Sequence, residues 1–435
     1  MVAFPSWRRL FGRLALATIV VAGATIAGSA RGAEPLHPNI VFILTDDHVP
    51  TEFGCYGNSE AKTPNIDALA AGGARFTNAM VVCPMCAPSR VCLMTGQYPG
   101  RFYPNPNNLT AGVPSGQPTL QEILKSAGYR TGFVGKAHFR LPGTGSLEDQ
   151  LKGIGFTWVS HAHGYRYLQD AQHDEPRTFA SACSFIAENK ERPFALFVFT
   201  RLTHSLAVAP PKFMEGVRAS QGRAAVAAWL DSLIGDVVRT LDESGLRERT
   251  AIILASDNAS SGGGEGENKC TLYEGRVPLV VSWPARIKAS QVVDAVVQNI
   301  DFLPTILEIC EVPIPPGTET DGASFLPLMT GKAAEWRKAA FFEFGWARSV
   351  RTARWKYIAI RDPRGNASTK QTGVYGGAAD LLFDLQADPS EKKNLFEDPA
   401  HAGIVKEMQG LLRAHCATYD YPFGDFGGGP PPPRH

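Results

Sequence analysis

The chain has 435 residues, of which 44% are hydrophobic and 20% are charged, and its 43 Lys and Arg residues nearly balance its 42 Asp and Glu residues. This composition excludes a wholly disordered or fibrous protein and supplies enough apolar material for two or so domains, or for one large domain with an appendage. The net charge of +1 gives no reason to expect a nucleic-acid-binding protein, and eight cysteines are too few for a disulfide scaffold.

The N-terminal segment, residues 1–33, has the pattern of a secretory signal peptide. Arg8, Arg9 and Arg13 precede an apolar run at 14–27, and small residues follow it. A transmembrane helix needs about 20 apolar residues, so this shorter run favours cleavage over an uncleaved anchor. We therefore expect a periplasmic or secreted protein without stable membrane insertion, exported by either the Sec or the twin-arginine route.

Three β-prone runs that are apolar nearly throughout lie at 39–45, 194–200 and 250–256. Continuous apolar runs are typical of strands buried on both faces of a parallel sheet. Apolar residues recur at helical spacing over 223–246, where Gly245 ends the pattern, and shorter helices are expected at 65–71 and 119–127. This alternation predicts an α/β fold with a large, mostly parallel sheet flanked by helices.

The pattern changes after about residue 330. Short strands without long helices between them are expected at 340–344, 355–360 and 381–385. A helix is expected at 402–414. We therefore predict a large α/β domain at 34–330, a smaller C-terminal antiparallel α+β subdomain at 331–425, and a flexible Gly/Pro tail at 426–435.

Polar pairs follow two of the three buried runs. Asp46 and Asp47 come directly after the first, and Asp257 and Asn258 come directly after the third. In parallel sheets ligands gather at the carboxyl ends of strands, so the two pairs can converge. Three carboxylates and one amide suit a hard divalent cation such as Ca²⁺ or Mg²⁺ rather than zinc. The alternative is that each pair only caps the turn or helix that follows it.

A cysteine-containing segment follows, with Cys83-Pro-Met-Cys86-Ala-Pro-Ser-Arg90 at its start. A Cys-x-x-Cys pair ordinarily suggests a redox site or a zinc site. The chain has no second cysteine pair at zinc spacing, and the Pro-Ser-Arg that follows is foreign to thioredoxin-like motifs. Neither of these functions therefore accounts for the segment.

The segment that begins at Cys86 and continues through Arg90 to Gly96 resembles the signature of type I sulfatases, which belong to the alkaline phosphatase superfamily. Other segments resemble that family in the same order along the chain: Asp46-Asp47, 63–70, Gly135-Lys136-Ala137-His138, Ser256-Asp257-Asn258, Lys269, 273–278, 301–305 and 383–385. The resemblance covers roughly residues 38–400. It implies an alkaline phosphatase-like fold and the hydrolysis of sulfate esters.

The resemblance also implies a modified nucleophile and a metal ion. In the family a maturation enzyme converts the signature cysteine, here Cys86, to Cα-formylglycine. The hydrated aldehyde is a geminal diol, so one hydroxyl can attack sulfur and the other can later expel sulfate. The implied metal ion is Ca²⁺, with Mg²⁺ as the alternative, and its implied ligands are Asp46, Asp47, Cys86, Asp257 and Asn258.

The remaining residues implied by the resemblance are cationic or titratable. Arg90 would fix the formylglycine hydroxyl, while Lys136 and Lys269 would neutralise sulfate oxygens in the transition state. His138 would be the partner of the diol, and His204 would donate a proton to the leaving alcohol. The expected substrate is a sulfated small molecule or carbohydrate.

Two other functions stay open. One is the hydrolysis of phosphodiesters or phosphonate monoesters, since relatives of this fold use the same nucleophile and metal. The other is a binding protein that keeps the fold but is never matured at Cys86.

Overall fold

The structure is a computed structural model that describes residues 37–101, 112–164, 175–202, 209–216, 222–259, 275–332, 335–344, 347–360 and 380–418. The chain divides into two units, Met1–Leu36 and His37–His435, and every described residue belongs to the second. The predicted signal peptide and the Gly/Pro tail lie outside the described residues. Among the helices of the described ranges, none is both long and apolar enough to cross a membrane.

The largest element of the fold is an eight-stranded sheet in the order β5-β4-β6-β1-β7-β8-β2-β9. Its pairings are parallel except at β8, which is antiparallel to both of its neighbours. The strands are β1 (Asn39–Thr45), β2 (Ala74–Phe76), β4 (Arg130–Lys136), β5 (Trp158–His163), β6 (Phe194–Phe199), β7 (Thr250–Ser256), β8 (Leu279–Ser282) and β9 (Gln291–Val293). The prediction of a large, mostly parallel sheet is confirmed.

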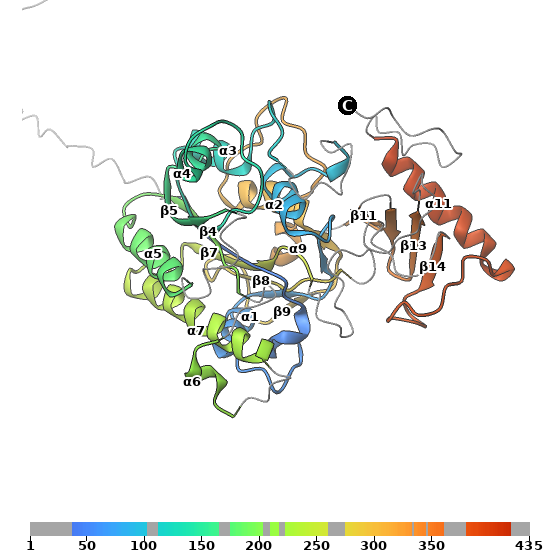
Figure 1. Cartoon of the computed structure of the whole chain (residues 1–435), viewed down its shortest axis with the longest axis horizontal. Helices are drawn as coiled ribbons and strands as arrows, with labels where there is room; N and C mark the ends of the chain where they lie inside the picture. Colours follow the sequence, from blue (N-terminus) through green and yellow to red (C-terminus); the bar gives the residue numbers. More distant parts are fainter. Residues whose placement is uncertain are drawn as a thin grey trace, which may run out of the picture. The chain divides into compact units, whose positions relative to one another are not determined.

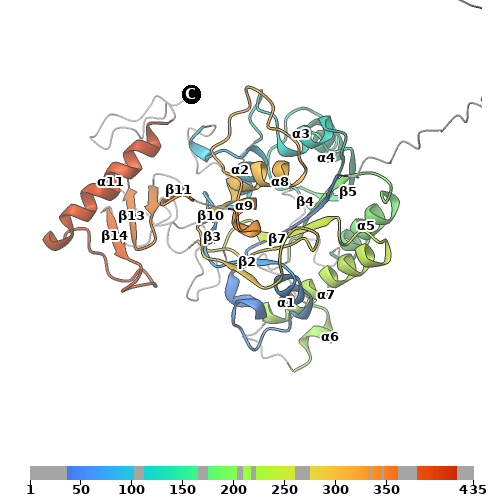
Figure 2. The ribbon, with the colours of Figure 1, turned by 180° about the vertical axis from the view of Figure 1, so that it is seen from behind.

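Helices cover both faces of this sheet (Figures 1 and 2). One face carries α1 (Pro64–Ala71), α5 (Glu175–Glu188), α6 (Pro211–Met214) and α7 (Gly222–Glu243). The other carries α2 (Cys86–Thr95), α3 (Leu120–Ser126), α4 (Leu147–Gly153), α8 (Phe302–Ile309) and α9 (Leu326–Thr330). The helices predicted at 65–71, 119–127 and 223–246 are therefore present. The last of them ends at Glu243, and Gly245 turns the chain with a φ of 67°.

Strand β1 shows why the central runs are apolar throughout. Its seven residues are all buried. Ile40, Phe42 and Leu44 pack into the core under α2, α3 and α8, whereas Val41 and Ile43 pack into the core under α1, α5 and α7. Because successive side chains of a strand point to opposite faces, a strand covered on both faces needs an apolar residue at every position.

A second sheet follows in the C-terminal part of the chain. It is antiparallel, in the order β11-β12-β13-β14, and consists of β11 (Ala340–Phe344), β12 (Ala347–Arg351), β13 (Trp355–Ile360) and β14 (Leu381–Asp384). Helix α11 (Ala402–Cys416) packs on one face. The other face packs against Met80, Cys83 and Met85. These three residues lie in the stretch that runs from the short strand β3 (Ala79–Met80), which pairs with β10 (Val297–Gln298), to the start of α2. The C-terminal sheet therefore supports the loop that leads into α2.

Candidate active site

The two polar pairs lie side by side at the carboxyl ends of β1 and β7. These strands are parallel neighbours in register, so the residues that follow them are level with each other. The backbone N–H of Asp47 donates to Asp257 Oδ1 at 3.4 Å, and Asn258 Nδ2 donates to Asp47 Oδ1 at 2.5 Å. Asp46 and these three residues are all buried. The convergence expected from the sequence is therefore produced by the register of one strand pair.

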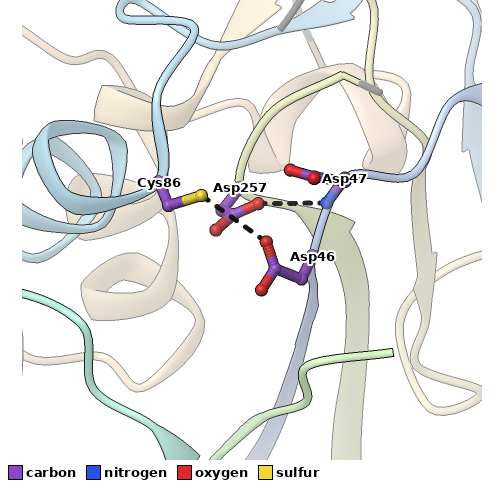
Figure 3. Close-up of side chains that lie close together, drawn as sticks. All are labelled: Asp46, Asp47, Cys86 and Asp257. Carbon is purple, nitrogen blue, oxygen red and sulfur yellow. Dashed lines mark hydrogen bonds between the residues drawn. The ribbon is translucent and has the colours of Figure 1, made fainter. Parts of the chain in front are cut away.

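Cys86 faces these carboxylates from the first position of α2, as Figure 3 shows. Its thiol donates to Asp46 Oδ1 over an Sγ–O distance of 3.5 Å. One ligand atom from each of Asp46, Asp47, Asp257 and Cys86 lies within 4.8 Å of all the others. The N-terminus of a helix carries partial positive charge and unpaired N–H groups, so this end of α2 favours an anion beside Cys86.

Two buried cations complete the cluster. Arg90, one turn after Cys86, donates from Nε to Asp257 Oδ2 at 2.9 Å, with Nη2 at 2.8 Å from the same oxygen, and from Nη1 to the carbonyl oxygen of Lys136 at 2.6 Å. Lys136, the last residue of β4, donates from Nζ to Asp46 Oδ2 at 2.5 Å. Burial by itself lowers the pKa of Arg90, but Asp257 and Asp46 outweigh it and raise that pKa.

This set of side chains fits a divalent cation. The three carboxylates and the two cations leave the cluster with one net negative charge, and buried carboxylates this close repel one another strongly. Asn258 Oδ1 is also buried and has no hydrogen-bond partner in the described part of the chain. Asp46, Asp47, Asp257 and Asn258 together therefore offer the oxygen ligands that both Ca²⁺ and Mg²⁺ accept.

The backbone is unusual at several positions of the site. Asp47 and His138 have left-handed conformations, with φ of 60° and 48°. Non-glycine residues adopt this region rarely and often at functional sites. Gly135 also has a positive φ, 94°, and a Cβ there would lie 2.1 Å from the carbonyl oxygen of Phe199. Only glycine fits at this position, where it sets the direction of the Lys136 backbone, two residues before His138.

His204 and Lys269 lie outside the described residues, so the structure does not place them. The strand before His204 is described, and its exit is held by a residue that the sequence analysis missed. The Glu175 carboxylate accepts hydrogen bonds from Thr200 Oγ1 and from the Arg201 backbone N–H, both at 2.8 Å. Burial raises the pKa of Glu175. No motif marks Glu175, and only the packing of α5 against the sheet brings it to this strand end.

Known protein families match both parts of the chain. The family model described as Sulfatase matches residues 38–312, and the model described as N-sulphoglucosamine sulphohydrolase, C-terminal, matches residues 268–417. Arylsulfatase A of Homo sapiens is 30% identical over 452 residues, covering 87% of this chain and 88% of its own. The N-acetylgalactosamine-6-O-sulfatase of Bacteroides thetaiotaomicron is 27% identical and covers 88% of this chain and 94% of its own.

A solved structure agrees with these sequence matches. It comes from work on the metabolism of multiple glycosaminoglycans by Bacteroides thetaiotaomicron, and it superposes with a TM-score of 0.73 at 25% identity. The match covers 88% of this chain and all of the other. The chain thus belongs to the sulfatase family of the alkaline phosphatase superfamily, as its signature indicates. It is a sulfuric ester hydrolase, an enzyme that cleaves sulfate esters.

Proposed function

We propose that this enzyme hydrolyses sulfate esters of a carbohydrate, with Cys86 matured to formylglycine as the nucleophile and a divalent cation beside it. The observation that carries the proposal is the position of Cys86, which begins a buried helix and donates to Asp46 within a cluster of three carboxylates. A buried cysteine in a structural role would have no need of this surrounding charge.

The described residues have distinct tasks in this proposal. Asp46, Asp47, Asp257 and Asn258 hold the cation, which when bound lowers the pKa of the nucleophilic hydroxyl and attracts one sulfate oxygen. Arg90 keeps Asp257 in place through its Nε and Nη2 contacts and adds positive charge beside the nucleophile.

The remaining site residues would act on the sulfate group and on the protons. Lys136 orients Asp46 and, together with Lys269, balances the charge of the sulfate oxygens. His138 serves the nucleophilic diol, and His204 donates the proton to the leaving alcohol.

The substrate class and the location of the enzyme are also part of the proposal. The N-acetylgalactosamine-6-O-sulfatase is named for a sulfated amino sugar, and the similar solved structure is described in connection with glycosaminoglycans. These relatives support a sulfated carbohydrate as the substrate. Maturation by a formylglycine-generating enzyme and export directed by residues 1–33 complete the proposed history of the chain.

Mass spectrometry of the peptide that contains Cys86 tests the nucleophile. Conversion of cysteine to formylglycine lowers the peptide mass by about 18 Da, because an aldehyde replaces the thiol. We expect this mass in active enzyme prepared in a host with the maturation enzyme. Active enzyme that carries only unmodified cysteine would refute the proposed nucleophile, and an unconverted, inactive natural protein would favour the binding function.

Turnover of paired model substrates tests the reaction. An aryl sulfate and an aryl phosphate with the same leaving group differ chiefly in the charge of the group that is transferred. We expect a higher kcat/KM for the sulfate. The same leaving group is also tested as a phosphodiester and as a phosphonate monoester, and a higher kcat/KM for either of these than for the sulfate would favour the alternative hydrolase.

A further inference from the structure

We propose that Arg223, acting with Glu52 and His48, is a positioning residue that fixes the Asp46–Asp47 turn in its metal-binding conformation. The inference rests on the proposed metal site, because it assigns a supporting role toward Asp47. The three residues form a chain of contacts outside the carboxylate cluster, which we call the Arg223 clamp. No part of the clamp belongs to the segments that resemble the sulfatase motifs.

The contacts of the clamp run directly to a proposed metal ligand. Arg223 Nη2 donates to the carbonyl oxygen of Asp47 at 2.5 Å, and Arg223 Nε donates to Glu52 Oε1. The other carboxylate oxygen of Glu52 lies 2.7 Å from His48 Nδ1 and accepts the backbone N–H of Val49 at 3.1 Å. The guanidinium group of Arg223 therefore links the carbonyl oxygen of Asp47 to the Glu52 carboxylate, which also binds the next two residues along the chain, His48 and Val49.

The Asp46–Asp47 turn needs such support because its backbone is in an unfavourable region. Asp47 has a φ of 60°, a left-handed conformation that is unfavourable for a non-glycine residue and persists only where its surroundings hold it. The N–H of His48 donates to Ser256 Oγ at 3.0 Å, which fixes one side of the Asp47–His48 peptide. Arg223 fixes the other side, at the carbonyl oxygen of Asp47. Both ends of this peptide are then held, and the direction of the Asp47 carboxylate follows from it.

The position of Arg223 in its helix points to a role other than helix stability. It is the second residue of α7, next to Gly222. The N-terminus of a helix carries partial positive charge, so a cation in the first turn is disfavoured there by the helix itself. Arg223 instead binds the Glu52 carboxylate and the carbonyl oxygen of Asp47, which are 171 and 176 residues away in the sequence.

Charge and burial both favour the contacts of the clamp. His48 is fully buried and the Glu52 side chain is 12% exposed, whereas the Arg223 side chain is 33% exposed. Burial by itself raises the pKa of Glu52, but His48 and Arg223 outweigh it and hold that pKa at about 2. Glu52 is therefore a charged acceptor at neutral pH, and charge-assisted hydrogen bonds are shorter and stronger than neutral ones.

The test compares Arg223→Met with Arg239→Met. Arg239 lies on the same helix, but its ion pairs, with Asp236 and Glu243, are on the surface. The affinity for Ca²⁺ is measured in calcium buffers through the metal-dependent rise in the thermal midpoint, with purified full-length protein. Loss of a group that orients a metal ligand typically weakens metal binding by about 10–100-fold. We expect a loss of this size in Arg223→Met and an unchanged affinity in Arg239→Met.

Two further variants separate positioning from simple structural loss. Arg223→Lys keeps the charge but cannot reach both Glu52 and the Asp47 carbonyl oxygen with a planar group, so we expect partial recovery of Ca²⁺ affinity. Glu52→Gln keeps the shape and removes the charge; it decides the question if Arg223→Met does not fold, and its affinity should also fall. At saturating Ca²⁺, kcat should recover in both Arg223→Lys and Glu52→Gln.

The outcomes distinguish this inference from the proposed function. If the unmodified enzyme binds Ca²⁺ and Arg223→Met binds it equally well, the clamp has no positioning role. If the thermal midpoint falls in the absence of metal but the Ca²⁺ affinity is unchanged, Arg223 only stabilises the fold, and the inference is again wrong. If the wild-type enzyme itself binds neither Ca²⁺ nor Mg²⁺, the proposed metal site is wrong, and the clamp then has no metal ligand to position.

Discussion

Replacing Arg90 with methionine should destabilise the metal-free enzyme strongly and the metal-loaded enzyme less. The guanidinium group is fully buried, lies against Asp257 through Nε and Nη2, and donates to the carbonyl oxygen of Lys136. Methionine fills most of the volume but leaves the Asp257 carboxylate without these contacts. The cluster then carries two net negative charges instead of one.

The magnitude follows from the cost of breaking a buried ion pair, about 3–5 kcal/mol when one charge is left behind. The unit that contains the site, His37–His435, has about 400 residues, which at about 2.1 cal/mol/K per residue gives an unfolding entropy near 0.8 kcal/mol/K. The thermal midpoint of the metal-free variant should therefore fall by about 4–6 °C. A bound divalent cation compensates the added negative charge, so excess Ca²⁺ should raise the midpoint of Arg90→Met more than that of the unmodified enzyme.

The assay is thermal unfolding of both proteins in chelator and in excess Ca²⁺, with Arg90→Lys as the conservative control. Lysine keeps the charge but cannot make the paired contact with Asp257, so its midpoint should lie between the other two. A fall of less than about 1 °C in chelator would show that Asp257 does not depend on Arg90. Equal falls with and without Ca²⁺ would show that the cation does not bind in this cluster.

Three further predictions follow from single positions. Cys86→Ala should lower turnover by about 1,000-fold or more with little change in the thermal midpoint, whereas Cys83→Ser should stay active despite losing about 1–3 kcal/mol to a buried hydroxyl. The pKa of Glu52 falls from 4.5 to about 2 on folding, so its ionised form should add about 3 kcal/mol to the free energy of unfolding above pH 4.5, and this contribution should be lost as the pH falls to 2. A difference in unfolding free energy between wild type and Glu52→Gln that stays constant across that window would contradict this. Gly135→Ala should cost about 3 kcal/mol or more, since its Cβ would overlap a backbone oxygen, while Gly153→Ala, with open space around it, should be nearly neutral in chemical denaturation.

Some structural features were harder to predict from the sequence than others. Strand β4 was not predicted from the sequence, because two of its seven residues are glycines, which weaken a strand pattern. Its Gly132 is required by packing, since a Cβ there would lie 2.8 Å from the Phe185 ring. Strand β12 was not predicted either, because it contains Arg348 and Ser349, polar residues that are nevertheless buried. In each case neighbours distant in the sequence decide the structure.

Helix α2 is a related case. All ten of its residues are buried, so it has no polar face and none of the periodicity that marks a surface helix. The signature that it carries predicts chemistry, but it does not predict a helix. The helix is what places Cys86 and Arg90 one turn apart, with both side chains turned toward Asp46 and Asp257.

The sequence by itself determined the continuous apolar strands, the helices with a clear apolar face, and the family, because each of these is written in a short stretch of residues. It also indicated that Asp46-Asp47 and Asp257-Asn258 converge, since the exits of parallel strands meet at one edge of the sheet. Only the tertiary structure decided that Arg90 holds Asp257, that Glu175 holds the end of β6, and that Arg223 holds Asp47. These partners lie 167, 26 and 176 residues apart, and a pairing between single charged side chains at such distances leaves no local pattern; it exists only once the packing of helices on the sheet has brought them together.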